Sequence, residues 1–427
     1  MKKRIYSILM AVAFTAAAFA QSGTNSPYSQ YGLGVLSDQS SGFNRGMNGL
    51  GLGSRAGNRV NFINPASYSA LDSLTFIFDV GMSGQNTNFK EGNRRINAKN
   101  ADFEYAVAGF RLFKNLGMSF GIVPFTNVGY NYTESQLLNN ESYIRCNQVF
   151  EGKGGIHAIY LGAGWQAFKG FSVGANISYL WGDIERKTLT TYNDESVNSL
   201  NKIYNLDVKS YKLDFGMQYE MPISKKDKLT LGATFSLGHS LNAEPSCDII
   251  SRNPGTNFSD TTRYVMGKSL ELPFMYGVGI MYNHNDQLDL GFDYSLQQWG
   301  STSFPAYKNG AYTSDDSYFM DRHKFTFGGD YCADKESRAF LKRLHYRAGV
   351  SYATPYFKVG EKDGPKEISV SAGFGIPVKN VWGNRSMVNI SGQWVHSSAD
   401  GLITENTLRI NIGVTFNERW FMKWKVR

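Results

Sequence analysis

The chain of 427 residues has little cysteine and little proline, with three of the first and eleven of the second. Its cysteines, Cys146, Cys247 and Cys332, lie far apart, form no CxxC pair and are odd in number. This spacing argues against a disulfide framework and against a zinc site. We therefore expect neither a metal nor another cofactor.

Catalytic motifs are also missing. The six histidines form no HExxH motif and no cysteine and histidine set with ligand spacing, and the chain has no GxSxG elbow. Four of the histidines fall near the ends of predicted strands, where polarity at an exposed rim is the commoner reason for their presence. The sequence therefore favours a protein that is not an enzyme.

Beyond residue 20 no apolar run is long enough for a spanning helix, which excludes a helical inner-membrane protein. Before it, three basic residues (2–4) precede an apolar run that ends in Ala18-Phe19-Ala20. This is the pattern of a secretory signal peptide, and the run is too short for a membrane anchor. Cleavage after Ala20 leaves Gln21 first, and a lipid anchor would need a cysteine there.

Charged residues are sparse, since Asp, Glu, Lys and Arg make up 19% of the chain. The formal net charge of +8 falls to about +5 without the three bases of the signal peptide, and the other bases are scattered among acids. A nucleic acid partner is therefore not expected. The chain is instead rich in glycine (45), tyrosine (25) and phenylalanine (29), which favours strands over helices.

The main pattern that is present has a period of two residues. In the stretch 171–182, FSVGANISYLWG, apolar residues alternate with small or polar ones, and Leu180 is the exception. Such alternation is typical of a strand with one apolar and one polar face. It recurs in about fourteen segments, which we take as strands: 74–84, 102–113, 116–126, 155–167, 170–182, 207–222, 228–240, 272–283, 286–299, 321–333, 343–355, 366–378, 386–396 and 406–417.

A soluble antiparallel sheet also alternates, so two architectures compete. Globular strands have roughly 5–6 residues, whereas a strand that crosses a bilayer needs about 9–11, and the segments here have about 10–14. Their polar face carries Asp, Lys, Glu and Arg, as a wet or plugged lumen would. We predict an all-β, transmembrane antiparallel barrel of about fourteen strands in the cell outer membrane.

The connections support this prediction. Short connections alternate with long ones (85–101, 127–154, 183–206, 241–271 and 300–320), as expected for short periplasmic turns and long outer loops. An even number of strands would bring both termini to the periplasmic side.

Four parts of the chain are predicted: the signal peptide 1–20, an N-terminal segment 21–73, the barrel 74–417 and a tail 418–427. Segment 21–73 is rich in Gly and Asn and cannot bury a core alone. A fourteen-stranded barrel has room inside, so we expect this segment to fold into the lumen as a hatch. Trp420, Phe421 and Trp424 of the tail are expected to anchor it at the membrane interface.

The chain resembles the FadL-type family of outer-membrane transporters for long-chain fatty acids and other hydrophobic compounds. The resemblance rests on Asn64-Pro65-Ala66 shortly before the first strand, on the strand count and on the alternating connections. It implies a barrel plugged by the hatch and an interior pocket for a hydrophobic ligand. It also implies a kink in the third strand that opens sideways to the membrane.

The resemblance implies a substrate path along six residues: Phe62, Asn64, Pro65, Ala66, Pro124 and Phe125. Pro124 lies in the third predicted strand, and proline there marks a bulge, an edge or a break because it cannot donate to the ladder. Two interpretations stay open. Pro124 forms a lateral gate, or it ends the paired part of the strand near the outer loop.

Charged residues on the polar face form a predicted lumen network of both signs: Asp79, Asp214, Asp289, Asp293, Lys324, Arg347 and Arg409. Inward charges are costly unless they are paired or hydrated. The mixture of signs favours a salt-bridged wall that holds the hatch over a selectivity ring of one charge.

Two functions follow as hypotheses. The first is passive transport of hydrophobic or amphiphilic small molecules, such as fatty acids, through the hatch-plugged barrel. The second is a barrel scaffold that binds other envelope proteins in a surface secretion or assembly complex. Outer-membrane lipid contacts the barrel in both. An apolar cavity between 21–73 and the wall is expected for a transporter and not for a scaffold.

Overall fold

The structure is a computed structural model that describes residues 23–137, 143–267, 269–308, 310–379 and 385–419. The predicted signal peptide and the residues Trp420, Phe421 and Trp424 lie outside the described residues. Within the described chain, no helix combines the length and the apolar character that crossing a membrane requires.

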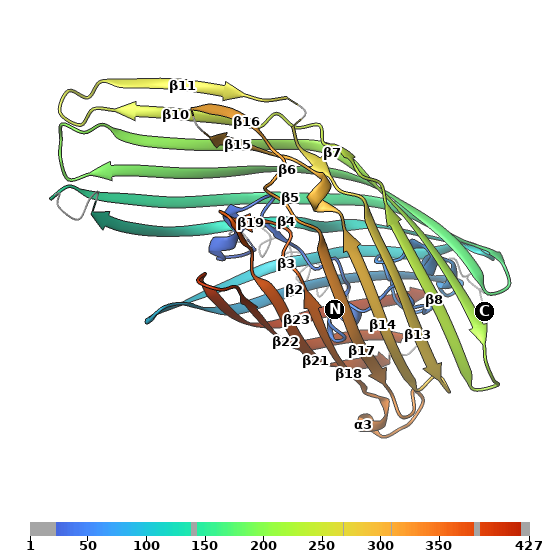
Figure 1. Ribbon diagram of the computed structural model, residues 1–427. Coiled ribbons are helices and arrows are strands. Elements are labelled where there is room, and N and C mark those ends of the chain that lie inside the picture. Colours follow the sequence, from blue (N-terminus) through green and yellow to red (C-terminus); the bar gives the residue numbers. More distant parts are fainter. Residues whose placement is uncertain (1–22, 138–142, 268, 309, 380–384, 420–427) are drawn as a thin grey trace, which may run out of the picture.

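Fourteen antiparallel strands close into a barrel, as predicted (Figure 1). Closure occurs where the first barrel strand pairs with the last, for example Phe78 with Phe416. In chain order the strands are β2 (Thr75–Glu91), β3 (Arg94–Phe113), β4 (Leu116–Leu137), β5 (Arg145–Phe168), β6 (Phe171–Tyr192), β7 (Ser199–Pro222), β8 (Asp227–Ser236), β13 (Met275–His284), β14 (Leu288–Gln297), β17 (Arg322–Tyr331), β18 (His345–Ala353), β21 (Lys366–Lys379), β22 (Arg385–Ser398) and β23 (Thr404–Arg419).

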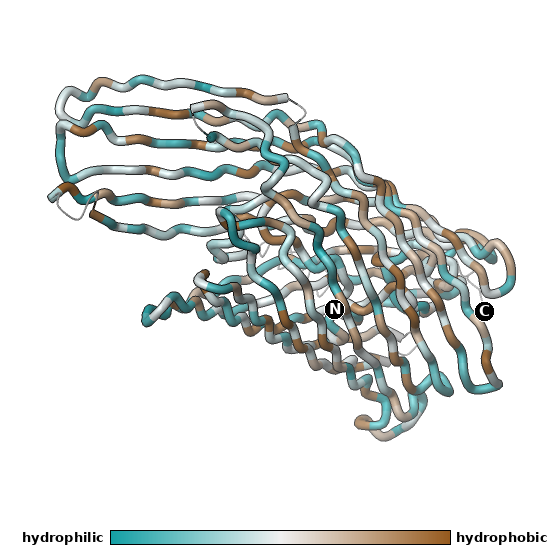
Figure 2. Tube along the Cα trace, viewed as in Figure 1, coloured by the Kyte–Doolittle hydropathy of each residue, from teal (hydrophilic) through white to brown (hydrophobic). Residues whose placement is uncertain are grey.

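The period of two places apolar side chains outside and polar ones inside the barrel. In β6, Ile177 and Tyr179 are exposed, whereas Ser172, Asn176 and Ser178 are buried. Figure 2 shows the apolar residues recurring along the barrel strands. An exposed apolar band around a closed barrel with a polar interior is the arrangement that a bilayer requires.

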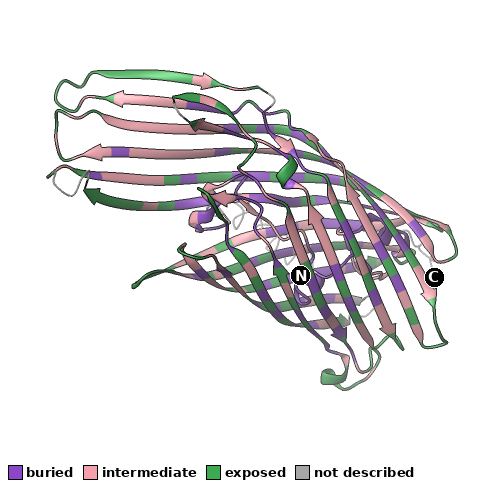
Figure 3. Cartoon of the chain, in the orientation of Figure 1, coloured by how far each residue is buried: buried purple, intermediate pink, exposed green. Residues whose placement is uncertain are grey.

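The N-terminal segment passes through the barrel and is largely buried (Figure 3). It contains η1 (Pro27–Gln30), β1 (Val35–Leu36), α2 (Gly42–Arg45) and η2 (Pro65–Ala70). Ser29 contacts Gly129 in the outer half of β4, at the end of the barrel with the long connections. The hatch therefore runs from the long-loop end to the short-turn end, where β2 begins. The even number of strands brings the start of β2 and the end of β23 to the same end of the barrel, where Thr75 pairs with Arg419, whereas Gly23 of the hatch lines the outer cleft.

The predicted long connections contain strands, which corrects the sequence analysis. The four strands β4 to β7 continue well past the predicted ends, and β10 (Ser246–Arg252) and β11 (Ser259–Val265) add to β7. We use the name extension for the outer parts of these four strands together with β10 and β11. The outer parts are the residues after 126 in β4, before 155 in β5, after 182 in β6 and before 208 in β7. It projects from the barrel as a long sheet (Figure 1). These segments were missed because, outside the bilayer, no apolar face marks a strand.

Glycines mark the corner where the extension leaves the barrel. Gly154, Gly155 and Gly182 have φ values of 106°, 152° and 155°. A Cβ atom on Gly154 would lie 1.9 Å from the carbonyl oxygen of Asp183, so the neighbouring strands approach too closely here for a side chain. The backbone can bend at this corner because these positions are glycine.

Short strands and helical turns lie in the connections between the barrel strands. An aromatic cluster packs beneath the loop 299–320, where Trp299 lies 5.3 Å from Phe319 and 5.1 Å from Tyr356, measured between ring centroids. The remaining elements are β9 (His239–Ser240), β12 (Glu271–Leu272), η3 (Trp299–Ser301), β15 (Phe304–Lys308), β16 (Ala311–Asp315), α3 (Phe340–Arg343), β19 (Lys358–Val359) and β20 (Lys362–Asp363).

Candidate functional site

Asn64-Pro65-Ala66 fastens the hatch to the barrel wall. The Asn64 side chain is fully buried; its Oδ1 accepts from the Ala66 amide at 3.1 Å, and its Nδ2 donates to the Met217 carbonyl of β7 at 3.0 Å. Asn64 thereby caps η2, as asparagine does at helix starts. A Cβ atom on Gly174 of β6 would lie 2.5 Å from Pro65, so the wall is glycine where the hatch touches it.

Phe62 also belongs to this packed region. Its ring lies 6.0 Å from the rings of Tyr105 in β3 and Tyr160 in β5, and it is buried. Hatch and wall share one apolar core here, which includes Leu33, Val60, Tyr68, Leu71, Ile77, Val107, Val123, Val128, Ile156 and Leu180. Phe62 and the residues 64–66 therefore lie in packed protein.

Pro124 and Phe125 lie where the barrel wall divides. Pairing of β3 with β4 runs only as far as Ala106 and Ile122, and a bulge in β4 follows between Pro124 and Thr126. The strand itself continues to Leu137, paired with β5. Pro124 thus does not end β4. It marks the place where β4 leaves β3 and where β1 of the hatch pairs with it instead.

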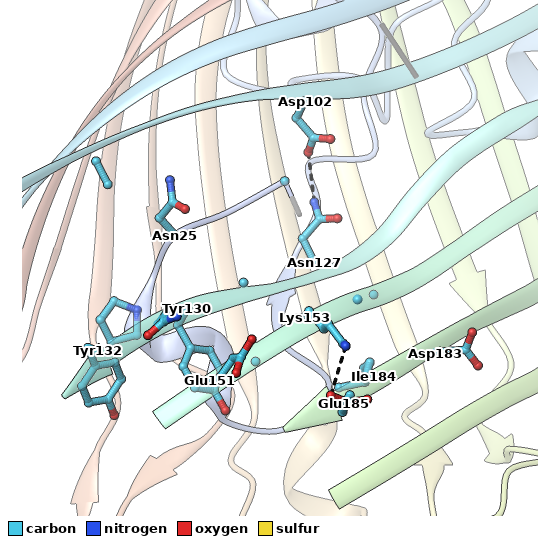
Figure 4. Close-up of a pocket in the computed structure, with 18 of the residues that line it drawn as sticks. Asn25, Asp102, Asn127, Tyr130, Tyr132, Glu151, Lys153, Asp183, Ile184 and Glu185 are labelled. Atoms are coloured by element: carbon cyan, nitrogen blue, oxygen red, sulfur yellow. Dashed lines mark hydrogen bonds and ion pairs between the residues drawn. The ribbon is translucent and has the colours of Figure 1, made fainter. Parts of the chain in front are cut away.

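A cleft of about 1900 Å³ opens between the separated strands (Figure 4). Its walls are the outer parts of β2 and β3 on one side and of β4, β5, β6 and β7 on the other, and the hatch residues Gly23, Asn25 and Pro27 line it. Seven carboxylates face one arginine and one lysine in this lining: Glu91, Asp102, Glu134, Glu151, Asp183, Glu185 and Asp207 against Arg94 and Lys153.

Five of the seven predicted lumen charges contact the hatch. Lys324 Nζ lies 3.2 Å and Arg409 Nη1 3.6 Å from the carboxylate of Asp38. Although burial raises the pKa of Asp38, these cations and Arg45 hold the pKa of Asp38 well below its ordinary value. On the neighbouring strand β14, the Asp293 carboxylate accepts from two hatch amides, those of Gly51 at 2.7 Å and Leu52 at 2.9 Å.

The other two contacts are weaker or less direct. Asp289 lies 4.0 Å from Arg59 of the hatch. The Arg347 guanidinium stacks 4.1 Å from the Phe43 ring of the hatch and pairs with Asp330 of β17 at 3.0 Å. A cation over an aromatic face stabilises the contact when water is excluded.

The two remaining predicted charges bind the wall. Asp79 accepts from Tyr105 at 2.9 Å and from Thr415 at 3.1 Å, and the Tyr105 oxygen in turn accepts from the Gly42 amide of the hatch. Asp214 bonds Lys212 and Ser236.

The sequence analysis missed the hatch partners of this network. Arg45 pairs with Glu104 of β3 at 2.7 Å, with both side chains buried, and Asp38 joins two wall cations. A signal was present in the sequence. Isolated charges such as Asp38, Arg45 and Arg59 in a segment rich in Gly and Asn need partners once the segment enters a charged lumen.

Around Phe62 and Tyr68, the side chains of hatch and wall pack into one core. A second cavity, of about 280 Å³, lies at the short-turn end, and its lining includes Arg55, Asp72, Glu220, Asp289 and Asp330. Charged side chains line both this cavity and the outer cleft. The cysteines 146, 247 and 332 are free and buried, and among the described residues no His, Cys, Asp and Glu groups are arranged to hold a metal.

Solved structures with the same fold include a channel and a transporter. The "CymD monoaromatic hydrocarbon channel" shares 15% identity at a TM-score of 0.60, over 90% of this chain and 98% of that one. The Ralstonia pickettii toluene transporter TbuX shares 14% at 0.58, over 89% and 98%. A Pseudomonas aeruginosa FadL homologue shares 12% at 0.60, over 88% and 98%. At these identities the likeness establishes the fold, and the titles describe channels and transporters, not enzymes.

Comparison with curated proteins finds no match. The FadL-type resemblance is therefore a likeness of architecture, while the family itself comes from a match along the sequence. The family model described as BamG covers residues 1–427, the whole of the chain. The chain belongs to the BamG family.

Proposed function

We propose that this protein is an outer-membrane docking protein. Its closed barrel anchors an elongated sheet, the extension, beyond the membrane, where other envelope proteins bind. One observation carries this proposal: the lumen is packed with the hatch while the wall continues far past the apolar band. A chain that only moved small molecules would not need this sheet.

The size of the extension supports binding to a macromolecule. The aromatic residues Tyr179, Trp181 and Tyr211 end the apolar band on β6 and β7. Beyond them, residues 183–192 of β6 extend roughly 30 Å at about 3.3 Å per residue. A sheet of this size offers two faces and two edges. Interfaces between proteins typically bury about 800 Å² on each partner, an area that a sheet of these dimensions supplies.

The bonds across the lumen also favour a fixed plug. Ion pairs and amide contacts join the hatch to β3, β14, β17 and β23, and the pair with β3 is buried. A route along Phe62 and 64–66 would have to break the shared core. This packing supports docking over passage through the lumen.

The test is a variant whose strands are shortened in register. Removing 132–150, 186–204 and 247–264 leaves the ladder pairs Asn131 with Glu151, Glu185 with Asn205 and Ser246 with Val265 intact, each joined by a short turn. We expect the barrel to fold and to lose its co-purified envelope proteins, measured by mild extraction, cross-linking and mass spectrometry. Equal recovery of the same partners with the shortened barrel would overturn the proposal.

Passage of hydrophobic compounds is a second candidate, because the wall divides between β3 and β4. The fold is that of hydrocarbon channels, and the opening gives a lateral route that avoids the packed lumen. Fatty acids are the first compounds to test. The experiment reconstitutes the full chain in liposomes and measures uptake of a fluorescent fatty acid and of toluene. Flux no faster than in liposomes without protein would remove this candidate.

A further inference from the structure

We infer that the free edge of β4 in the outer cleft binds an extended, basic segment of another polypeptide as an added strand. The inference rests on the proposed docking function and narrows its partner to a chain segment rich in Lys or Arg. Where the wall divides, β4 beyond Ile122 and β3 before Ala106 are no longer paired with each other, so each presents an edge to the cleft.

The edge follows from the division of the wall. On one side, β4 pairs with β5 as far as Leu137. On the other side β3 has left at Ile122, and the hatch covers β4 only briefly: β1 pairs at Thr126 and Asn127, and Ser29 Oγ accepts from the Gly129 amide at 3.1 Å. Among the described residues, no strand pairs with that side of residues 131–137.

Backbone geometry shows which groups this edge presents. In an antiparallel ladder every second residue directs its N–H and C=O to the same side. Gly129 directs both groups to the hatch, since its amide and its carbonyl both bond Ser29. Residues 131, 133 and 135 share this phase, so their backbone groups face the cleft. Such a row is a template for another strand.

The hatch itself demonstrates that the edge accepts a strand. Val35 and Leu36 pair with β4 in antiparallel register, and the Ser37 amide donates to the Phe125 carbonyl at 3.0 Å. This strand is two residues long, and the chain then leaves the wall. The rest of the edge stays open toward the cleft.

The charge of the cleft selects the partner. Its seven carboxylates outnumber its two bases, in a chain whose net charge is +8. Lys153 is already engaged with Glu185 at 3.1 Å (Figure 4). Glu134 on β4 and Glu151 on β5 are exposed beside the edge. Clefts lined by one sign of charge attract ligands of the other sign, so Lys and Arg side chains fit.

Aromatic rings add a second contact. Tyr130 and Tyr132 lie 6.0 Å apart on β4, and Trp181 of β6 also lines the cleft. Tyr130 is buried, but the partly exposed rings of Tyr132 and Trp181 attract the cations of Lys and Arg. A small cation would not use the backbone row, and the cleft is long enough for several residues in extended form. The combination of edge, charge and rings points to a polypeptide.

The experiment measures peptide binding to the detergent-purified full chain by fluorescence anisotropy. The probe is a labelled ten-residue peptide in which Lys alternates with Val. Two controls separate charge from strand pairing: Glu replaces Lys in one, and Pro replaces Val in the other, so that backbone donors are lost at a constant charge. We expect saturable binding of the Lys-Val peptide, at least tenfold weaker binding of the Lys-Pro peptide and none of the Glu-Val peptide.

The matched variants are Thr133→Pro and Thr133→Ala. Proline at 133 removes one N–H that faces the cleft. It leaves the hydrogen bonds to β5 intact, because on β4 these are made by residues 132 and 134. We expect at least fivefold weaker binding for Thr133→Pro and no change for Thr133→Ala, with equal thermal unfolding. Glu134→Gln with Glu151→Gln should weaken binding and reduce its salt dependence.

Equal affinity of the Lys-Val and Lys-Pro peptides, or unchanged binding to Thr133→Pro, would overturn the inference. If Thr133→Pro unfolds, a Lys-Val peptide N-methylated at alternate residues makes the same comparison on the unaltered protein. A Thr133→Pro protein that fails to bind the peptide could still co-purify with its native partners. This result would contradict the inference about the β4 edge and would leave the docking function supported. Loss of partners only on shortening the extension would support docking alone.

Discussion

The guanidinium of Arg45 in the hatch lies 2.7 Å from the carboxylate of Glu104 on β3, and water is excluded from both side chains. Neither charge would be stable there alone, because burying an unpaired ion costs several kcal/mol. The Arg45 guanidinium also donates to the carbonyls of Asp38 and Ser40, so that one side chain joins the wall to the fold of the hatch. The hatch is held as part of the barrel.

Removing Arg45 should loosen the hatch. Arg45→Met leaves Glu104 buried without its cation, and loss of one partner of a buried pair typically costs about 3–5 kcal/mol. We expect a lower unfolding temperature and higher ion leakage in planar bilayers. The double variant Arg45→Met with Glu104→Leu removes both charges and should recover much of the stability. Equal leakage of the single variant and the unaltered protein would contradict this account.

Arg347→Ala tests a second contact between wall and hatch, that of Arg347 with the Phe43 ring. The variant loses the contact with the Phe43 ring and leaves Asp330 with His345 as its remaining partner. We expect raised leakage and a stability loss of about 3 kcal/mol, within the range for breaking a buried pair. The matched control is Arg322→Ala, which breaks an ion pair with the exposed Glu367 at 3.0 Å. Exposed pairs contribute about 0–1 kcal/mol. Similar losses of stability for both variants would therefore contradict the role of Arg347 in holding the hatch.

Two variants separate the two roles of the Asn64 side chain, which caps η2 and bonds the wall. Asn64→Asp keeps the oxygen that accepts from the Ala66 amide but loses the donor to the Met217 carbonyl. Asn64→Ala loses both. Loss of a cap costs about 1 kcal/mol, whereas a buried unpaired carboxylate costs more. We expect Asn64→Asp to destabilise the protein more than Asn64→Ala in thermal unfolding monitored by circular dichroism, and the reverse order would show that capping dominates.

Close approach of the hatch should make Gly174 intolerant of any side chain. A Cβ atom there would lie 2.5 Å from the Pro65 carbonyl carbon, which cannot rotate away. Overpacking of this kind costs about 1–3 kcal/mol, so Gly174→Ala should lower the unfolding temperature. Gly392→Ala is the control, because nothing lies within 4 Å of its Cβ position. Equal unfolding temperatures for the two variants would mean that the hatch is not seated on β6.

Acid should weaken the contacts of Asp38. Its pKa is lowered in the folded protein, so the carboxylate stabilises the hatch at neutral pH. That stabilisation is complete above the ordinary carboxyl pKa of about 4 and is lost as the pH falls below it. We expect planar-bilayer leakage to rise as the pH falls below about pH 4. Asp38→Asn should show higher leakage at neutral pH and a smaller rise in acid.

Strand positions inside the membrane were predictable because the bilayer imposes a period. From β2 to β23 the predicted segments overlap the observed strands, since side chains facing lipid must be apolar while those facing the lumen need not be. Outside the bilayer both faces meet water and the constraint disappears. The outer halves of β5 and β6 therefore have the composition of polar loops, although they pair continuously from Cys146 with Tyr192 to Gly154 with Ile184.

For the candidate site, the sequence predicted which wall charges face inward but not which hatch residues they contact. The inward charges Asp293, Lys324 and Arg347 could be named from alternation, and a network that holds the hatch could be expected. Their partners could not be named, because Gly51, Asp38 and Phe43 belong to a segment without a period. Which hatch residue meets which wall residue depends on the path of the segment through the barrel.

The sequence by itself determined the barrel, its inside and its outside, since alternation records local contact with lipid or with the lumen at every second residue. Only the tertiary structure decided the length of the extension, the place where β3 and β4 separate and the filling of the lumen. Each depends on pairings between residues far apart in the chain, such as Ser29 with Gly129 and Arg45 with Glu104. Backbone hydrogen bonds and buried ion pairs between distant residues leave no periodic trace in a single sequence.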